Sequence, residues 1–203
     1  MAHIRRILAA ALTIALVVGL SAVPARALDG NWDVVPGGEV VLYGNSLQVT
    51  NNGATIIIQQ PFVEGDLFDD QPIGGVPDPG LDRVGYLNYL TCNGAQGPLG
   101  LTLNVEMLSA WKVYADSQSG GIVDIRITDF GLRFSGPGCV WRVTGTLHGT
   151  YNNFTDTLTI DEPEDSGSLV ISNATCFPFQ NGQSPGISGS FQIDPSTTIN
   201  RRI

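Results

Sequence analysis

VWRVTGTLHGTYNNFTDTLTI, residues Val140–Ile160, is the stretch that decides the fold of this chain. Its residues alternate in character, with Val143 and Leu147 on one face and Thr146 and His148 on the other. A period of two residues indicates a β-strand that buries one face. A polar break follows, and then a second alternating run, so the stretch predicts two antiparallel strands joined by a turn.

Segments of this kind recur along the chain, separated by Gly, Asn, Pro and Asp about every eight to twelve residues. This spacing predicts an all-β fold, namely a single antiparallel β-sandwich, with a flattened β-barrel as the alternative. The last four segments predict a four-strand meander. The predicted strands are Glu39–Tyr43, Leu47–Thr50, Thr55–Gln60, Val84–Thr91, Leu99–Met107, Trp111–Ala115, Ile122–Thr128, Gly131–Ser135, Val140–Tyr151, Asp156–Ile160, Ser168–Asn173 and Ile187–Ile193.

Two turns and one long loop are predicted in the first half of the chain. Gly44-Asn45 is expected to join the first two strands as a hairpin. Asn52-Gly53 is expected to form the next turn, because Asn-Gly is the preferred type I′ sequence. Pro61–Asp82 contains four prolines and six acidic residues, and this composition predicts a long surface loop.

The N-terminal residues 1–27 predict a cleavable export signal. Arg5 and Arg6 form a charged head, and Ile7–Leu20 is an apolar run of 14 residues that is short for a membrane span. Ala25-Arg26-Ala27 has the small-x-small pattern of a cleavage site. We therefore expect residues 28–203 to be one domain, secreted or associated with the cell envelope, and without a transmembrane anchor.

The charge of the predicted mature domain disfavours nucleic-acid binding. Cleavage removes three of the ten basic residues and none of the nineteen acidic residues, so seven basic residues face nineteen acidic ones and the net charge is −12. A phosphate backbone would repel such a chain.

Three cysteines lie in the predicted mature domain: Cys92, Cys139 and Cys176. Export favours a disulfide bond, and the odd number leaves one thiol over. Metal binding is disfavoured, because no two cysteines have C-x-x-C spacing and His148 is the only histidine in this part of the chain.

One sequence match to a hydrolase motif is rejected. Residues 182–186, GQSPG, match G-x-S-x-G, but Pro185 follows the serine and lacks the N–H that an oxyanion hole requires. The loop also precedes a predicted strand rather than a helix, and His148 comes before Ser184 in the chain. We predict a turn here and assign no catalytic residue.

Other polar groups receive structural interpretations. His148 falls on the polar face of its strand and is expected at the surface. The acidic residues form two clusters, one within the Pro61–Asp82 loop and one at residues 161–165, which are expected to be solvated, with calcium binding as the alternative. No metal site or cofactor is assigned.

Aromatic residues supply the binding hypothesis. Aromatic side chains of a β-sandwich usually lie in the core or pair across strands. Trp111, next to Lys112 and Tyr114, is the best candidate for an exposed aromatic strip that binds a ligand.

Eight segments form an ordered pattern along the chain: Trp32–Gly38, Leu90–Gly94, Gly97–Thr102, Ala110–Lys112, Ser135–Cys139, Gly149–Asn153, Leu169–Asn173 and Ser188–Pro195. In this order they resemble a family of small secreted actinobacterial β-proteins of unassigned molecular function. The resemblance implies that Cys139 and Cys176 form the disulfide and that Cys92 stays free, because an early cysteine of the family is missing here. It carries no catalytic residues.

The sequence thus predicts a secreted, non-enzymatic protein that binds a glycan, a lipid or a protein partner. A secreted hydrolase that uses two carboxylates, similar to a glycosidase, is the first alternative, and a structural surface or coat component is the second. An apolar cavity between the sheets would favour a lipid, and an exposed Trp111 would favour a glycan. Two buried acids about 5–10 Å apart would favour the glycosidase.

Overall fold

The computed structural model describes residues 32–68 and 82–202, and this part of the chain is all β. Its fourteen strands form only antiparallel ladders, in a two-stranded sheet and a twelve-stranded sheet. The predicted all-β antiparallel fold is confirmed. The predicted signal, residues 1–27, lies outside the described residues. Across the two described ranges, no helix has the length and apolarity that crossing a membrane requires.

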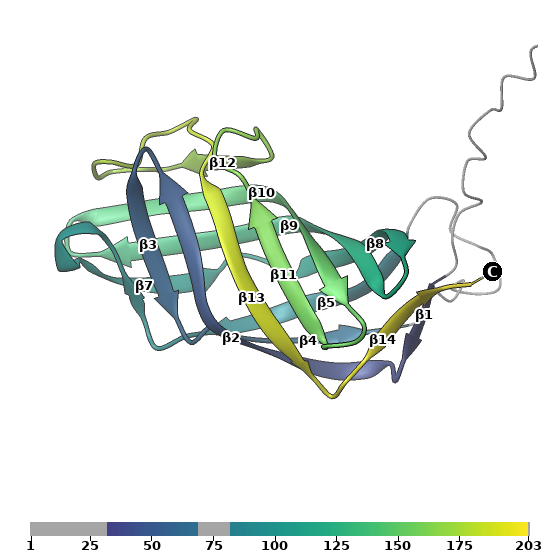
Figure 1. Cartoon of the computed structure of the whole chain (residues 1–203). Coiled ribbons are helices and arrows are strands. Elements are labelled where there is room, and N and C mark those ends of the chain that lie inside the picture. Colours follow the sequence, from purple (N-terminus) through teal and green to yellow (C-terminus); the bar gives the residue numbers. More distant parts are fainter. Residues whose placement is uncertain (1–31, 69–81, 203) are drawn as a thin grey trace, which may run out of the picture.

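Most of the described connections between strands are short, and the longest of them, residues 173–185, joins β12 to β13 (Figure 1). A single-turn 3-10 helix, η2, spans Pro98–Gly100. The strands are β1 Trp32–Val35, β2 Gly38–Asn51, β3 Ala54–Gln59, β4 Phe62–Leu67, β5 Arg83–Thr91, β6 Ala95–Gln96, β7 Thr102–Met107, β8 Trp111–Ser119, β9 Ile122–Gly136, β10 Cys139–Asn152, β11 Thr157–Glu162, β12 Leu169–Ser172, β13 Gly186–Asp194 and β14 Thr198–Arg201.

The large sheet closes into a flattened ring. Its ladders run from β2 through β4, β5, β8, β9, β10, β11 and β13 and back to β2. In Figure 1 the strands β2, β3, β11 and β13 form one layer that crosses the layer of β7, β9 and β10. β12 lies outside this ring, since among the described strands it pairs only with β10. The layout therefore corresponds to the flattened-barrel alternative rather than to two separate sheets.

β10 changes its partner at Gly145. Its second half pairs with β11 at Gly149–Asn152, and its first half pairs with β12 at Arg142–Gly145 on the same edge. Gly145 has a φ of 146°, and a Cβ there would lie 2.1 Å from the backbone oxygen of Ser168. A glycine is required at this position because β12 approaches so closely.

The predicted four-strand meander is therefore wrong in its order. β11 pairs with β13, while β12 returns to pair with β10, giving the order β12-β10-β11-β13. Because β12 runs antiparallel to β10, its end lies beside the start of β10. This position brings Cys139 and Cys176 close together, with their Cα atoms 5.1 Å apart, and the predicted disulfide between them is present. Cys92 is a free, half-buried thiol.

β2 and β9 also run through points where turns or breaks were predicted. The hairpin expected at Gly44-Asn45 does not form, because β2 continues through it and changes partner from β4 to β3. Likewise, the two strands predicted at Ile122–Thr128 and Gly131–Ser135 are parts of β9, which pairs first with β8 and then with β7. The turn at Asn52-Gly53 is confirmed, with φ values of 50° and 76°.

The loop predicted at Pro61–Asp82 is wrong at its start. Phe62–Leu67 form β4, which pairs with both β2 and β5 and alternates buried and outward-facing side chains. The prolines and acids that motivated the loop prediction lie mostly further on, at residues 69–81, outside the described residues.

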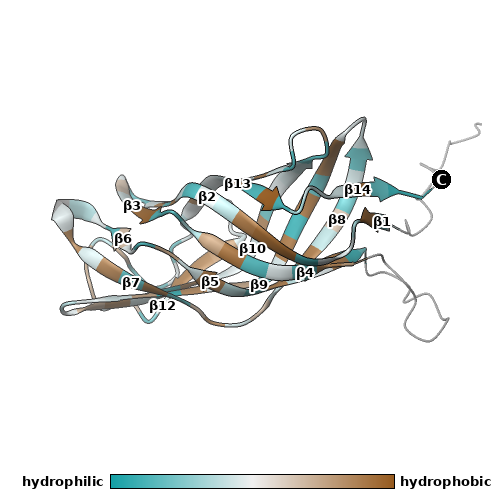
Figure 2. Cartoon of the chain, turned by 90° about the horizontal axis from the view of Figure 1, so that it is seen from below, coloured by the Kyte–Doolittle hydropathy of each residue, from teal (hydrophilic) through white to brown (hydrophobic). Residues whose placement is uncertain are grey.

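The interior of the ring is filled by side chains. Apolar and polar residues alternate along the strands in Figure 2. The largest fully buried side chains include Trp32, Trp141, Tyr151, Phe130 and Phe134. The internal hollow that the described residues line measures about 20 Å³, which leaves room for about one water molecule. The β1–β14 ribbon lies at one end of the ring, where Trp32 and Ile199 join the core (Figure 1).

We predict that Gly145→Ala will lower the free energy of unfolding by about 2–4 kcal/mol, because it adds both backbone strain and overlap with Ser168. Gly97→Ala is the control, since a Cβ there has no neighbour closer than 3.6 Å. Urea unfolding of both variants measures the difference. Equal midpoints for the two variants would contradict the role given to Gly145.

We also predict that Cys176→Ala will lower the free energy of unfolding by about 3–4 kcal/mol in the chain-entropy model. The bond closes a loop between residues 37 positions apart. Cys92→Ala is the matched control, because it removes a thiol that is not in a disulfide. Guanidinium unfolding of both proteins under non-reducing conditions is the measurement, and a loss below about 1 kcal/mol in Cys176→Ala would contradict the prediction.

Candidate functional site

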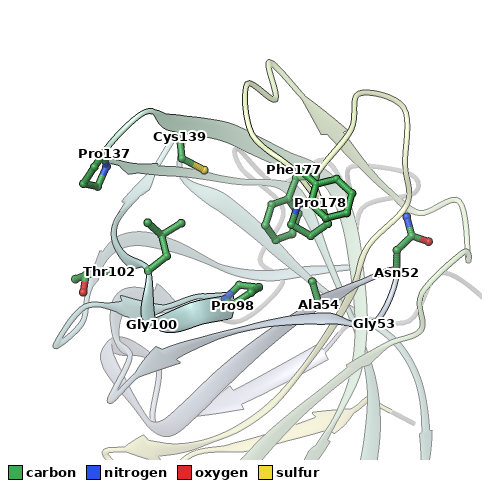
Figure 3. A pocket seen from close by; sticks show the side chains of 12 residues that line it. Asn52, Gly53, Ala54, Pro98, Gly100, Thr102, Pro137, Cys139, Phe177 and Pro178 are labelled. Carbon is green, nitrogen blue, oxygen red and sulfur yellow. The ribbon is translucent and has the colours of Figure 1, made fainter.

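A groove of about 860 Å³ opens at the end of the ring opposite the β1–β14 ribbon. Three segments line it: the β2–β3 turn, η2 with the start of β7, and the β9–β10 turn. The segment 177–179, which follows the disulfide, forms a further wall. Figure 3 shows Phe177 and Pro178 on one side of the groove and Pro98 and Ala54 on the other. The lining residues are Asn52, Gly53, Ala54, Pro98, Gly100, Leu101, Thr102, Pro137, Cys139, Phe177, Pro178 and Phe179.

A stack of three aromatic rings connects the groove to the core. The Phe134 and Trp141 rings are parallel within 5°, with centroids 4.0 Å apart. The Phe179 ring lies on the other face of Trp141, at 4.1 Å and 6°. Phe179 is buried and also lines the groove. The wall of the groove is therefore supported by packed rings that cannot move independently of the core.

Phe177 is the most exposed large apolar side chain in the described part of the chain, with 90% of its surface accessible. Its neighbour Cys176 is bonded to Cys139 on β10, and Thr175 N–H donates to the Val140 carbonyl at 2.9 Å. The backbone beside Phe177 is thus tied to β10 by a covalent bond and a hydrogen bond. Phe177 continues the apolar lining of the groove, and a contiguous exposed apolar surface marks a ligand-binding groove or an interaction site.

The groove carries no charged side chain among its twelve lining residues. Asn52 and Thr102 provide polar side chains, and the rest of the lining is apolar, cysteine or glycine. Ligand pockets of this kind are mostly apolar, measure about 300–1,000 Å³ and contain a few polar groups that orient the ligand. The groove can therefore hold an uncharged, largely apolar group.

The predicted binding residues Trp111, Lys112 and Tyr114 do not form an exposed strip. Trp111 is 4% exposed, and its ring lies 4.7 Å from that of Phe130. Tyr114 is also buried, beneath the Arg126 guanidinium, which lies 4.6 Å from the ring centre. Lys112 pairs with Asp129 at 2.8 Å, and this hydrogen bond raises the pKa of Lys112.

A buried carboxylate and a histidine form a second polar cluster. Glu162 is 3% exposed at the end of β11, and its Oε2 lies 2.6 Å from Nδ1 of His148. The same oxygen accepts the His148 backbone N–H at 3.1 Å. Hydrogen bonds from the Ser166 and Ser168 side chains also reach the carboxylate. His148 itself is half-exposed, as expected for the polar face of its strand.

These hydrogen bonds compensate for the burial of the Glu162 carboxylate. Burial acts to raise the pKa of Glu162, but hydrogen bonds from Ser166, His148 and Ser168, together with the charge of His148, outweigh it, so the pKa is lowered below 4.5. Buried carboxylates require such partners. Because Ser166 and Ser168 follow β11 and His148 lies on β10, the cluster connects the β11–β12 segment to β10.

The described residues contain no catalytic site for either hydrolase hypothesis, the pair of carboxylates or the G-x-S-x-G serine. Glu162 is the one buried carboxylic acid there, so no second buried acid faces it. Ser184 accepts the Gly167 N–H at 3.0 Å and precedes strand β13, as expected for a turn. Of the acidic loop, Glu64 and Asp66 lie on the outer face of β4, while Asp69, Asp70 and Asp78 lie outside the described residues. In the described ranges, no group of three or more His, Cys, Asp or Glu could hold a metal ion.

Comparisons with known proteins add no family: no family model matches the chain, and no curated protein or solved structure is significantly similar to it. The resemblance to secreted actinobacterial proteins therefore stays a prediction, and any functional argument depends on the geometry of the sites.

Sequence reasoning did not find the groove or the Glu162–His148 pair. The groove joins four segments that are distant in the chain, and its parts are glycines, prolines and apolar residues without a motif. The pair had one usable signal, because His148 lies on one predicted strand and Glu162 follows the end of the next, 14 residues further along the chain. Phe177 had another, since it follows a cysteine and lies outside the alternating segments.

We predict that Glu162→Gln will make the free energy of unfolding less dependent on pH between pH 6 and 3. The pKa of Glu162 is lower in the folded state than in the unfolded chain, so its contribution is present above about pH 4.5 and is lost as pH falls further. The Gln variant lacks this contribution and should lose less stability between pH 6 and 3. Urea midpoints across that range measure it. Glu39→Gln, at an exposed carboxyl, controls for the lost charge, and parallel curves for wild type and Glu162→Gln would contradict the prediction.

Proposed function

We propose that the protein is a non-enzymatic, extracellular or envelope-associated binding protein whose groove receives the apolar chain of an uncharged lipid. The observation that carries the proposal is Phe177, 90% exposed beside a groove lined without charge. A free-standing exposed phenylalanine costs hydration free energy, and burying it against a ligand recovers about 1.5–3 kcal/mol.

The lipid would lie in the groove at the end of the ring rather than inside it. The interior hollow described above, at about 20 Å³, is too small for an acyl chain. The groove, at about 860 Å³, is of the size of ligand pockets. A chain placed there would contact Phe177 and Pro178 on one side and Pro98 and Leu101 on the other. The closed ring behind it acts as a rigid support.

The charge of the protein supports an uncharged headgroup. The predicted mature domain has a net charge of −12. Most of its basic side chains face acidic partners, as in Arg126 with Asp116 and Arg133 with Glu106. An anionic lipid would meet a negative surface without a basic residue in the groove to receive it. The two alternatives, a carboxylate-dependent hydrolase and a coat component, gain no comparable site.

Tryptophan fluorescence provides the test, because Trp141 stacks on Phe179 at the groove wall. We expect a monoacylglycerol with a brominated acyl chain to quench the fluorescence of the wild-type protein saturably. Phe177→Ser should weaken the affinity about tenfold or more, since the burial of one phenylalanine is lost.

Phe154→Ser is the matched control, because Phe154 is 82% exposed in the β10–β11 turn, at the end of β10 far from the groove. It should bind the lipid as the wild type does. Absence of saturable quenching, or equal weakening by Phe154→Ser and Phe177→Ser, would contradict the proposal.

A further inference from the structure

A second hollow lies on the outside of the ring, where β2 changes partner from β4 to β3. It measures about 480 Å³. β3 ends at Gln59 and β4 begins at Phe62, so the two strands diverge at Gln60-Pro61 and leave a gap beside β2. The nine lining residues are Tyr43, Gly44, Asn45, Gln60, Pro61, Phe62, Thr91, Cys92 and Asn93. We name this hollow the amide hollow.

An aromatic pair forms one side of the amide hollow. Tyr43 on β2 is 48% exposed, and the ring of Phe62 meets it edge to face, with centroids 5.2 Å apart. The two residues are direct neighbours across the β2–β4 ladder. Phe62 therefore holds the Tyr43 ring in place while leaving much of that ring open to a ligand.

Three amide side chains and a hydroxyl form the other side. Asn45, Gln60 and Asn93 are all exposed, and Thr91 ends β5 beside them. The amide nitrogen Nδ2 of Asn93 donates to Oε1 of Gln60. After this bond, the Gln60 NH₂ group still has donors to offer and the Asn93 amide oxygen can still accept a hydrogen bond. A paired donor and acceptor on adjacent amides match the neighbouring hydroxyls of a sugar ring.

Backbone hydrogen bonds fix the segments that carry these side-chain amides before any ligand binds. Gln60 N–H donates to the Asn45 carbonyl at 3.0 Å, and Asn93 N–H donates to the Gln59 carbonyl at 3.0 Å. Gln60 has a φ of 45°, in the left-handed region that favours glycine. A bulky residue kept in that conformation, with its amide at the surface, points to a role for the side chain beyond folding.

The lining of the amide hollow also excludes ionic ligands. None of its nine residues is charged, and the predicted mature domain carries a net charge of −12. An anionic ligand would find no cation here. A purely apolar ligand would leave the amides without partners, and this loss is costly once they are covered. The chemistry that fits is uncharged, rich in hydroxyl groups, and flat enough to cover an aromatic ring.

We propose that the amide hollow is a carbohydrate-binding site for a neutral oligosaccharide. One sugar ring lies against Tyr43, and its hydroxyls exchange hydrogen bonds with Gln60, Asn93 and Asn45. The site is separate from the groove, shares no lining residue with it, and does not depend on the function proposed for it.

Titration calorimetry with cellohexaose, maltohexaose, mannohexaose and chitohexaose tests the assignment. We expect at least one of the four to bind with a Kd below about 1 mM. Tyr43→Ala should weaken that binding about tenfold through the loss of the stacked ring. Phe154→Ala, which removes an aromatic ring that is 82% exposed elsewhere, should leave it unchanged.

Gln60→Gly separates binding from folding. Glycine adopts a φ of 45° without strain, so this variant should melt at or above the wild-type temperature. Its affinity for the sugar should nevertheless fall about fivefold, because one amide is lost. A drop in affinity without a drop in stability cannot come from unfolding.

Side-chain amide signals in a ¹H–¹⁵N spectrum locate the bound sugar. Saturating oligosaccharide should shift the signals of Asn45, Gln60 and Asn93, and leave that of Gln118, which bonds to Asn200 near the β1–β14 ribbon, in place. Three results would each overturn the proposal: binding of none of the four sugars, equal affinity in Tyr43→Ala and wild type, or a loss confined to Tyr43→Ala with unshifted amides.

Discussion

The structure depends on three long strands, each of which pairs along one edge with two different strands in succession. β2, β9 and β10 are 14 to 15 residues long, and each changes neighbour near its middle. The change occurs at Gly44-Asn45 in β2, near Asp129 in β9 and at Gly145 in β10. At each point the backbone conformation or the distance to a neighbouring segment is unusual for a strand. Gly44 leaves room for Pro61 and the Phe191 ring, and Asp129 has a φ of 55°.

The partner changes also shape the outer surface. Where two short strands diverge beside one long strand, the ladder has a gap that side chains do not fill. The amide hollow occupies the gap beside β2, and a hollow of about 470 Å³, lined by Asp129 and Gly145 among others, occupies the gaps beside β9 and β10. The interior remains closed because the long strands continue past each gap. The surface hollows and the closed interior therefore both result from long strands that change partner along their length.

Much of the fold was predictable from the sequence, and the errors in strand order have one cause. Period-two alternation located ten of the fourteen described strands, all except β1, β4, β6 and β14, since it reports which face is buried. It carries no information about partners, so Gly44-Asn45 was taken for a turn and β12 was placed beside β11. The sites were less predictable. Trp111 was chosen as the best candidate for an exposed aromatic side chain, but it is buried beside Phe130. The groove contains only residue types that also occur in ordinary loops. Sequence shows alternation along a strand, but a site depends on which strands meet.

The sharing of the long strands also bears on how the domain comes apart. Each end of the ring contains half of β2, half of β9 and half of β10, so neither end can lose its ladders without exposing the inner faces of the same three strands. The two ends should open together, as one cooperative unit. In amide exchange, the central residues of these strands should then report global unfolding, while β6 and β12, held by few ladder bonds, open first.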